Sequence, residues 1–188
     1  MKQPILGNVK TRIAVTTNAA TALFIYKLLL HRLQQTTANL KNTKVYVYLS
    51  GDWSSNFGWT NVAQKVQCGD SLGERMYQAL HDVLQQHTKA ILIGSDCPYL
   101  TTAGIIDAFE QLSSKDVIIG PATDGGYYLI GMQQAHPQLF KEIAWSTPVV
   151  FAQTLTAIHA NHFSYSLLPM LSDIDTYNDW LHFQDTYN

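Results

Sequence analysis

A short run of branched apolar residues that ends in a carboxylate-bearing turn most constrains how this chain can fold. Residues 91–93 read Ile-Leu-Ile, and Gly94 and the turn 95–98 follow them. Three branched residues bounded by turn residues predict a short strand that is buried on both faces. In an open parallel sheet, ligands bind just beyond the carboxyl ends of the strands. Asp96 in this turn is therefore placed to hold a metal ion or a hydroxyl group, unless it merely caps the turn.

Strands and helices alternate along the rest of the sequence. β-branched and aromatic runs predict strands at residues 44–49, 62–67, 90–94, 116–120, 127–132 and 163–168. Apolar residues spaced by threes and fours predict helices at residues 19–35, 71–86, 102–112 and 149–159, and a last helix around Trp180. This order predicts the α/β class with a mostly parallel sheet, in a single domain that spans residues 1–188.

The composition excludes several classes of partner. The net charge is -2, so the sequence lacks the basic patch that a nucleic-acid surface needs. No apolar run approaches the roughly 20 residues that span a membrane, and the first residues lack the apolar core of a signal peptide. Cys68 and Cys97 are too few for a disulfide framework. We therefore expect a cytoplasmic protein that acts on small molecules.

Cations gather in a loop near the start of the sequence. Lys2, Lys10 and Arg12 lie around Pro4 and Gly7, in a chain that is otherwise poor in arginine. Such a loop can wrap phosphate groups, because arginine offers a two-pronged fork and lysine a point charge. The alternative is a basic, solvated tail.

A second candidate anion site precedes the helix at residues 71–86. Ser71 followed by Glu74 has the form of a capping box, which explains both residues structurally. The functional alternative is that the glycine-rich turn and the helix start face an anion, with help from Arg75.

Further carboxylates follow two later strands. Asp124 and the two glycines after it form either an ordinary turn or a close approach of backbone to a ligand. Asp173 and Asp175 alternate in an extended segment, so both side chains point to one side and can reach one hard cation. Thr176 with Asp179 has the form of a plain helix cap.

Six motifs in this order resemble one known family. The motifs are Lys2-x-Pro4-x-x-Gly7-x-Val9-Lys10-Thr11-Arg12, Gly69-Asp70-x-Leu72-Gly73-Glu74-Arg75-Met76, Ile93-Gly94-Ser95-Asp96-Cys97-Pro98, Gly120-Pro121-Ala122-x-Asp124-Gly125-Gly126-Tyr127-Tyr128-Leu129-Ile130-Gly131, Trp145-Ser146-Thr147 and Asp173-Ile174-Asp175-Thr176. Over nearly the whole chain the sequence resembles the DUF2064 family, GT-A-fold (glycosyltransferase-A-like) transferases of the nucleotide-diphospho-sugar transferase superfamily. Relatives of that family include the molybdenum-cofactor and phospholactate guanylyltransferases. The resemblance implies a three-layer α/β/α fold.

The resemblance also implies roles for particular residues. Lys10, Arg12 and Asp124 are implied in catalysis. Mg2+, or Mn2+ in its place, is implied at Asp96, Asp173 and Asp175. The nucleotide or its phosphates are implied at Lys2, Gly7, Lys10, Arg12, Arg75, Ser95 and Asp96. The acceptor is implied at Asp124, Gly125, Gly126, Ser146 and Thr147.

Two departures from the family pattern affect these expectations. Relatives carry a buried, central strand before the Lys-x-Pro loop, whereas Met1 begins directly at that loop. We therefore expect the fold to lack the usual first strand, and the natural start to lie upstream. Nucleotidyltransferases usually open with a Leu-Ala-Gly-Gly type of loop, which a Pro-x-x-Gly-x-Val-Lys-Thr-Arg sequence replaces here.

The expected function is a Mg2+-dependent nucleotidyltransferase that moves a nucleotide from an NTP to a small phosphorylated or anionic acceptor. Such a reaction needs positioning and charge stabilisation more than a protein nucleophile. Two alternatives stay open at this point. One is a glycosyltransferase that uses a nucleotide-sugar, with Asp124 as the base on the acceptor hydroxyl. The other is a degenerate nucleotide-binding protein without activity.

Overall fold

The computed structural model describes residues 1–51, 59 and 62–187. The chain divides into two compact units. The first unit contains Met1–Val66, Ser95–Leu100 and Ser172–Asn188, and the second contains Gln67–Gly94 and Thr101–Leu171. Both units combine helices and strands, as expected for the α/β class. The expectation of a single domain stays a prediction.

The second unit is built on a mixed sheet of four strands in the order β3-β5-β4-β6. The strands are β3 (Ala90–Ile93), β4 (Val117–Pro121), β5 (Tyr127–Met132) and β6 (Tyr165–Leu167). β5 runs antiparallel to both β3 and β4, whereas β4 and β6 are parallel. The prediction of a mostly parallel sheet is therefore wrong for this unit. The cause is the loop between β4 and β5, which is too short for the crossover that two parallel strands require.

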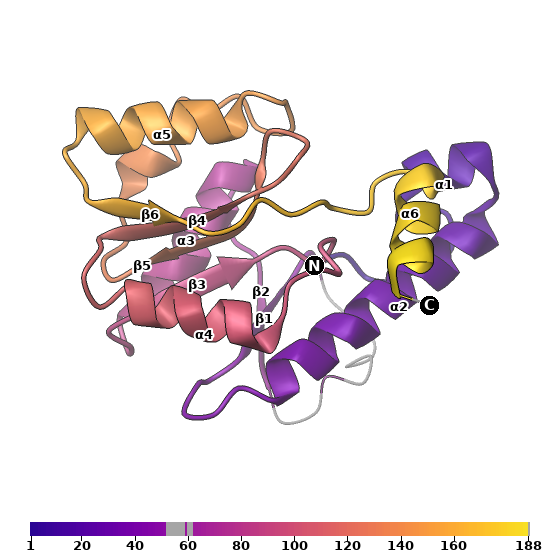
Figure 1. Cartoon of the computed structure of the whole chain (residues 1–188), viewed down its shortest axis with the longest axis horizontal. Helices are drawn as coiled ribbons and strands as arrows, with labels where there is room; N and C mark the ends of the chain where they lie inside the picture. Colours follow the sequence, from indigo (N-terminus) through magenta and orange to yellow (C-terminus); the bar gives the residue numbers. More distant parts are fainter. Residues whose placement is uncertain (52–58, 60–61, 188) are drawn as a thin grey trace. The chain divides into compact units, whose positions relative to one another are not determined.

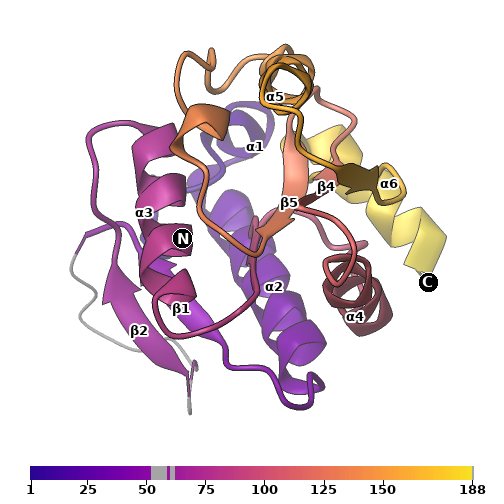
Figure 2. The same cartoon turned by 90° about the vertical axis from the view of Figure 1, so that its left-hand side faces the viewer.

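Helices cover both faces of this sheet (Figure 1). On one face, α3 (Leu72–Leu84), the 3-10 helix η1 (Pro137–Leu139) and α5 (Val150–Ala160) pack against alternate residues of the strands. α4 (Thr102–Gln111) lies on the opposite side of the sheet from α5, as both views show (Figures 1 and 2). The shared core of the first face consists of Met76, Leu80, Ala90, Val117, Ile119, Ile130, Met132, Leu139, Phe140 and Ile158.

The helices of the second unit begin where the sequence predicts. The Ser71 hydroxyl accepts a hydrogen bond from the Glu74 amide, and the Glu74 carboxylate reaches back to the Ser71 amide. The capping box predicted for these two residues is therefore confirmed. Thr101 caps α4 in the same way, by accepting from the Gly104 amide.

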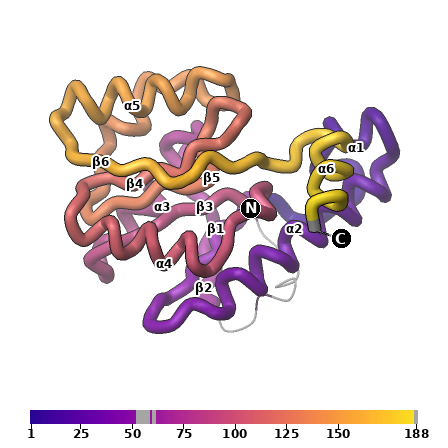
Figure 3. Tube along the Cα trace, viewed as in Figure 1, coloured from indigo at the N-terminus to yellow at the C-terminus, as the bar shows by residue number. Residues whose placement is uncertain are grey.

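The first unit joins a helical cluster to a small parallel sheet. The helices α1 (Thr11–Thr16), α2 (Ala19–Ala38) and α6 (Tyr177–Tyr187) come from opposite ends of the sequence and lie side by side (Figure 3). β1 (Tyr46–Leu49) and β2 (Ala63–Val66) form a parallel pair. The core between the helices consists of Ile13, Ala22, Ile25, Leu29, Ile174, Trp180 and Phe183.

The first two residues lie beside β1. Lys2 forms a parallel bridge with Ser50, and the Ser50 amide donates to the Met1 carbonyl at 2.7 Å. The expectation about a missing first strand stays a prediction. Among the described residues, no helix combines the length and the apolar character needed to cross a membrane.

Candidate functional site

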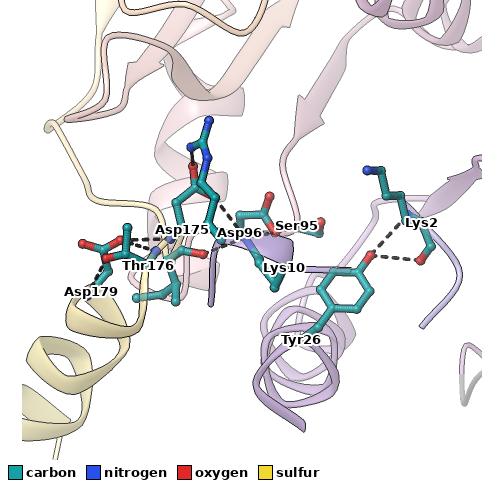
Figure 4. Close-up of polar contacts among 10 residues, drawn as sticks. Lys2, Lys10, Tyr26, Ser95, Asp96, Asp175, Thr176 and Asp179 are labelled. Carbon is teal, nitrogen blue, oxygen red and sulfur yellow. Dashed lines mark hydrogen bonds and ion pairs between the residues drawn. The ribbon is translucent and has the colours of Figure 1, made fainter. Parts of the chain in front are cut away.

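Two chain segments far apart in the sequence are joined within the first unit by the backbone of Ile174. Its amide donates to the carbonyl of Asp96 at 2.9 Å, so the acidic segment 172–175 lies against the turn after β3. The Ile174 side chain is fully buried in the helical core and anchors this segment. The carboxylates of Asp96 and Asp175 are thereby brought to one place (Figure 4).

The ammonium group of Lys10 lies between these two carboxylates. Its Nζ is 2.9 Å from Asp96 Oδ1 and 3.3 Å from Asp175 Oδ1, and it donates to the carbonyl of Ile174 at 2.6 Å. The Lys10 side chain is only 7% exposed, whereas the two carboxylates are 40% and 36% exposed. One buried ammonium group thus contacts three oxygen atoms, and the two carboxylates that supply two of them are open to solvent.

The backbone at Lys10 directs its side chain into this position. Lys10 precedes the first residue of α1 with φ 46° and ψ 47°, the left-handed region that costs a side-chain-bearing residue energy. Ile13, one turn later, is fully buried and fixes the short helix in the core. Packing of α1 therefore maintains a conformation that Lys10 would not adopt alone.

Arg12 supplies a second, more accessible cation. Its Nη1 donates to Asp175 Oδ2 at 2.9 Å, and its side chain is 72% exposed. Two cations thus face two carboxylates, so the cluster carries no formal net charge. The exposed guanidinium retains further donors that a phosphate group could accept.

The start of α6 fixes the backbone around Asp175. Asp179 Oδ2 accepts from the amides of Asp175 at 3.1 Å and Thr176 at 2.7 Å, and the Thr176 hydroxyl accepts from the Asp179 amide at 3.3 Å. These reciprocal bonds confirm the helix cap predicted for Thr176 and Asp179. They orient Asp175 without using its carboxylate.

The predicted phosphate loop lies beside this cluster. Both main-chain groups of Lys2 bond to the Tyr26 hydroxyl, which accepts from the amide at 3.2 Å and donates to the carbonyl at 2.9 Å. Burial raises the pKa of Tyr26 to about 12, and the nearby charge of Asp96 contributes further. Gly7 has φ 82°, which explains the glycine in this turn. The Ser95 hydroxyl donates a long 3.4 Å bond to Asp96 Oδ1.

Asp173 has a different neighbour from Asp175. It interacts with the thiol of Cys97, whose pKa rises to about 12, first through burial and then through the Asp173 charge. Within the described part of the chain, no group of three His, Cys, Asp or Glu side chains could hold a metal ion. The structure therefore brings Asp96 and Asp175 together around one cation, and the metal role of Asp173 stays a prediction.

The oxygen atoms around Lys10 suit a hard divalent cation. Mg2+ is usually held by one or two protein carboxylates together with substrate phosphates, and it prefers oxygen ligands. Asp96 and Asp175 already share one cation, and Ile174 offers a carbonyl oxygen beside them. These oxygen atoms fit Mg2+ or Mn2+ that is held together with substrate phosphates, and Lys10 Nζ contacts the same oxygen atoms.

The residues predicted for the acceptor belong to the second unit. Asp124 Oδ1 accepts from the Gly126 amide at 2.9 Å, as expected for an ordinary turn. Gly125 has φ 87°, and a Cβ there would overlap the Pro148 carbonyl, so its backbone packs on the segment that follows Ser146 and Thr147. The turn at Asp124 and the close packing of Gly125 on Pro148 explain the structure of this loop. Its role in binding the acceptor stays a prediction.

Ser146, Thr147 and Arg75 also have structural partners in the second unit. Ser146 has φ 63°, and the Thr147 hydroxyl donates to the Ala144 carbonyl at 2.6 Å. Arg75 Nε donates to the Gly69 carbonyl at 2.9 Å and so tightens the turn before α3. The predicted phosphate role of Arg75 is not tested by these contacts.

Sequence reasoning missed two parts of the site. The Ile174 carbonyl contributes through the backbone, which a side-chain motif does not reveal. Tyr26 lies inside a helical pattern and carries no signal that distinguishes it from a core residue. For the Ile174 carbonyl, the sequence offers one indirect signal, which is the position of Ile174 between two aspartates.

The comparisons with known proteins agree with this architecture. Residues 32–147 match the family described as "Uncharacterized protein conserved in bacteria (DUF2064)". No curated protein matches the sequence. The family resemblance inferred from the six motifs is therefore confirmed.

Solved structures with a similar fold include one in complex with CTP and one in complex with manganese. A protein of Desulfovibrio desulfuricans G20, provisionally named a nucleotide-diphospho-sugar transferase, is 28% identical with a TM-score of 0.88, over 94% of this chain and 80% of that one. The CMP:2-keto-3-deoxy-manno-octonic acid synthetase complexed with CTP is 8% identical with a TM-score of 0.60, over 85% and 87% of the chains. Rv0371C of Mycobacterium tuberculosis H37Rv, in complex with manganese, is 17% identical with a TM-score of 0.51, over 82% and 84%. At such low identity, the last two show likeness of fold alone.

Proposed function

The chain belongs to the DUF2064 family, and from this premise we propose that it is a metal-dependent nucleotidyltransferase. The reaction would transfer a nucleotide from an NTP to a small phosphorylated or anionic acceptor. Similarity of fold to a synthetase that was solved with CTP supports a nucleotide donor. A manganese complex of another protein with this fold supports a divalent cation.

The observation that carries the proposal is the assembly of Lys10, Arg12, Asp96 and Asp175 from three separate parts of the sequence. Two cations and two carboxylates meet within 3.3 Å contacts in the first unit. The ion pair between the exposed Arg12 and Asp175 contributes only about 0–1 kcal/mol to folding. Stability alone therefore gives little reason for an arginine at this position. Charged groups of both signs at one open site suit a ligand that contains phosphates and a metal ion.

Each charged residue has a definite task in the proposed reaction. Asp96 and Asp175 would hold the divalent cation, which neutralises negative charge on the donor phosphates when it is bound. Arg12 is exposed enough to bind a phosphate through two parallel hydrogen bonds. Lys10 would contribute a point charge to the same phosphates.

The chemical step is a displacement at the α-phosphorus of the donor. An oxygen of the acceptor attacks this phosphorus, and the bond between the α-phosphorus and its bridging oxygen to the β-phosphate breaks. Pyrophosphate leaves with that electron pair, and Lys10 and Arg12 stabilise its growing negative charge. Asp124, Gly125, Gly126, Ser146 and Thr147 are proposed to bind the acceptor.

Release of pyrophosphate tests this function directly. The protein is incubated with each NTP, Mg2+ or Mn2+, and a panel of small phosphorylated and carboxylic acids. We expect one combination to release pyrophosphate, and Asp96→Asn to reduce the rate at least about 100-fold, because a metal ligand is lost. Asp107→Asn is a matched control, since this exposed carboxylate lies on α4 in the second unit and accepts a hydrogen bond from Gln111.

A glycosyltransferase is the second candidate, and similarity to the provisionally named nucleotide-diphospho-sugar transferase favours it. In this case the same carboxylates would hold a metal ion on the diphosphate of the donor, and Asp124 would be the base on the acceptor hydroxyl. Cleavage of UDP- or GDP-sugars without pyrophosphate release from any NTP would reject nucleotidyl transfer in favour of this reaction. Nucleotide binding that Asp96→Asn leaves unchanged, without any turnover, would reject both.

A further inference from the structure

We propose that Lys10 is the resident counter-cation of the Asp96–Asp175 pair and that it leaves this pair when a divalent cation binds. The inference rests on the metal requirement of the proposed function and specifies how the metal site is filled. In the free protein, the ammonium takes the place between the carboxylates. A metal ion and Lys10 therefore compete for the same oxygen atoms.

The contacts of Lys10 differ from those of an ordinary surface ion pair. Three oxygen atoms lie 2.6–3.3 Å from Nζ, and the side chain is 7% exposed. Because an ammonium group has three hydrogen atoms to donate, these three oxygens account for all of them. Lys10 is thus bound like a ligated cation rather than like a flexible surface lysine.

The two cations would contact the same carboxylate oxygens. A Mg2+ ion bound to a carboxylate oxygen lies about 2.0–2.1 Å from it. Binding of a divalent cation by Asp96 and Asp175 would therefore use the carboxylate oxygens that Lys10 Nζ contacts at 2.9 and 3.3 Å. Repulsion between like charges at such short distance would drive the ammonium out.

The chain allows Lys10 to move without unfolding the site. The lysine stem has four methylene groups with rotatable bonds, so its head can be repositioned while the backbone of α1 stays in place. Ile174 and Asp96 stay joined by their backbone hydrogen bond, which does not involve Lys10. Exchange would change the formal charge of the cluster from zero to +1, because one positive charge leaves and two enter. The metal-loaded site would therefore attract phosphates more strongly than the free site.

Binding of Mn2+ in the absence of nucleotide tests the competition. Free Mn2+ is measured by electron paramagnetic resonance while wild-type protein, Lys10→Met and Lys41→Met are titrated. Lys10→Met keeps an unbranched apolar stem of similar length to that of lysine but removes the charged head. We expect it to bind Mn2+ at least about ten-fold more tightly than wild type. Lys41→Met removes an exposed cation of the same unit and should match wild type.

A double variant tests whether the tighter Mn2+ binding arises at the Asp96–Asp175 pair. Adding Asp96→Asn to Lys10→Met should abolish the increase in affinity. Equal or weaker Mn2+ binding by folded Lys10→Met would overturn the proposal. An increase that persists in the double variant would overturn it as well, because the ion would then bind elsewhere.

A measurement on the unaltered protein covers the case in which Lys10→Met does not fold. Acylation of lysines by an amine-reactive reagent, followed by peptide mass spectrometry, reports whether Lys10 is accessible. Labelling of Lys10 should rise as Mn2+ is added, while labelling of Lys41 stays constant. No rise at a Mn2+ concentration that saturates the protein would contradict the exchange.

These outcomes are separate from those of the pyrophosphate assay. If pyrophosphate is released but Lys10→Met binds Mn2+ no better than wild type, the exchange fails and nucleotidyl transfer stands. If the variant gains affinity but no NTP is used, the exchange stands and nucleotidyl transfer fails.

Discussion

The amide of Ile174 donates a 2.9 Å hydrogen bond to the carbonyl of Asp96. This bond connects the turn after β3 with the segment before α6, and the fully buried Ile174 side chain holds it in the core of the first unit. The geometry of the carboxylate pair thus depends on an apolar residue between two aspartates.

Truncation of Ile174 should weaken both the fold and the site. We expect Ile174→Ala to lower the free energy of unfolding by about 2–5 kcal/mol, because it leaves a cavity in a close-packed core. Denaturant unfolding measures this loss. Ile5→Ala is the control: this side chain is 43% exposed, so its truncation should cost under about 0.5 kcal/mol.

Removal of Arg12 should affect ligand binding far more than stability. The side chain is 72% exposed, so its ion pair contributes at most about 1 kcal/mol to folding. We expect Arg12→Ala to raise the KM for the donor at least about ten-fold, through loss of a charge-assisted contact to phosphate. Steady-state kinetics and thermal unfolding distinguish these effects. Lys141→Ala removes an exposed cation of the second unit and should leave both quantities unchanged.

Gly125 should not tolerate a side chain. Its φ of 87° disfavours other residues, and a Cβ would overlap the Pro148 carbonyl. We expect Gly125→Ala to destabilise the protein by about 1–3 kcal/mol, seen as a lower Tm. At Gly94, the atom nearest to an added Cβ is the Tyr128 carbonyl oxygen, at 3.8 Å. Equal losses for Gly94→Ala and Gly125→Ala would show that neither the backbone conformation nor the contact with Pro148 matters.

Stability should fall in mildly acidic solution through His136. Burial lowers the pKa of this imidazole, which packs on the Phe163 ring with centroids 4.1 Å apart, and the charge of Asp116 opposes the shift in part. Below the unfolded pKa of about 6.5, the unfolded chain binds a proton that the folded protein resists. The contribution of neutral His136 to folding stability is therefore fully present above about pH 6.5. It is lost as the pH falls from there toward the lowered pKa of the folded protein.

Thermal unfolding at about pH 7.5 and about pH 5.5 measures this effect. The decrease in Tm between the two conditions should be smaller in His136→Gln, which has no group that titrates in this range. The same decrease in both proteins would place the pH dependence elsewhere.

The helices and strands were largely predictable because their apolar patterns are local. The segment 127–132 is one example, since β5 has the predicted bounds. Alternation of helices and strands along the sequence predicts parallel crossovers, which is wrong for β5, because no helix separates it from β4. Asp124 and its two glycines already indicated a tight turn, and a turn of this kind between adjacent strands favours a hairpin.

The short helix α1 could not be predicted from its own residues. Thr11, Ile13, Val15 and Thr16 are all β-branched, which disfavours a helix. Packing of Ile13 in the helical core overrides this preference, and it fixes the unusual backbone conformation of Lys10. The sequence suggests Lys10, Asp96 and Asp175 as candidates, but the insertion of Lys10 between the two carboxylates depends on this tertiary packing.

The pairing of Lys10 with Asp175 spans 165 positions of the sequence. During synthesis on the ribosome, the lysine and Asp96 are made well before the second carboxylate exists. The charge cluster is therefore among the last features of the protein that can form, since contacts between distant residues await the whole intervening chain. A nascent chain that ends before Asp175 therefore offers Lys10 one carboxylate of the pair, and the complete cluster can form only after Asp175 has been synthesised.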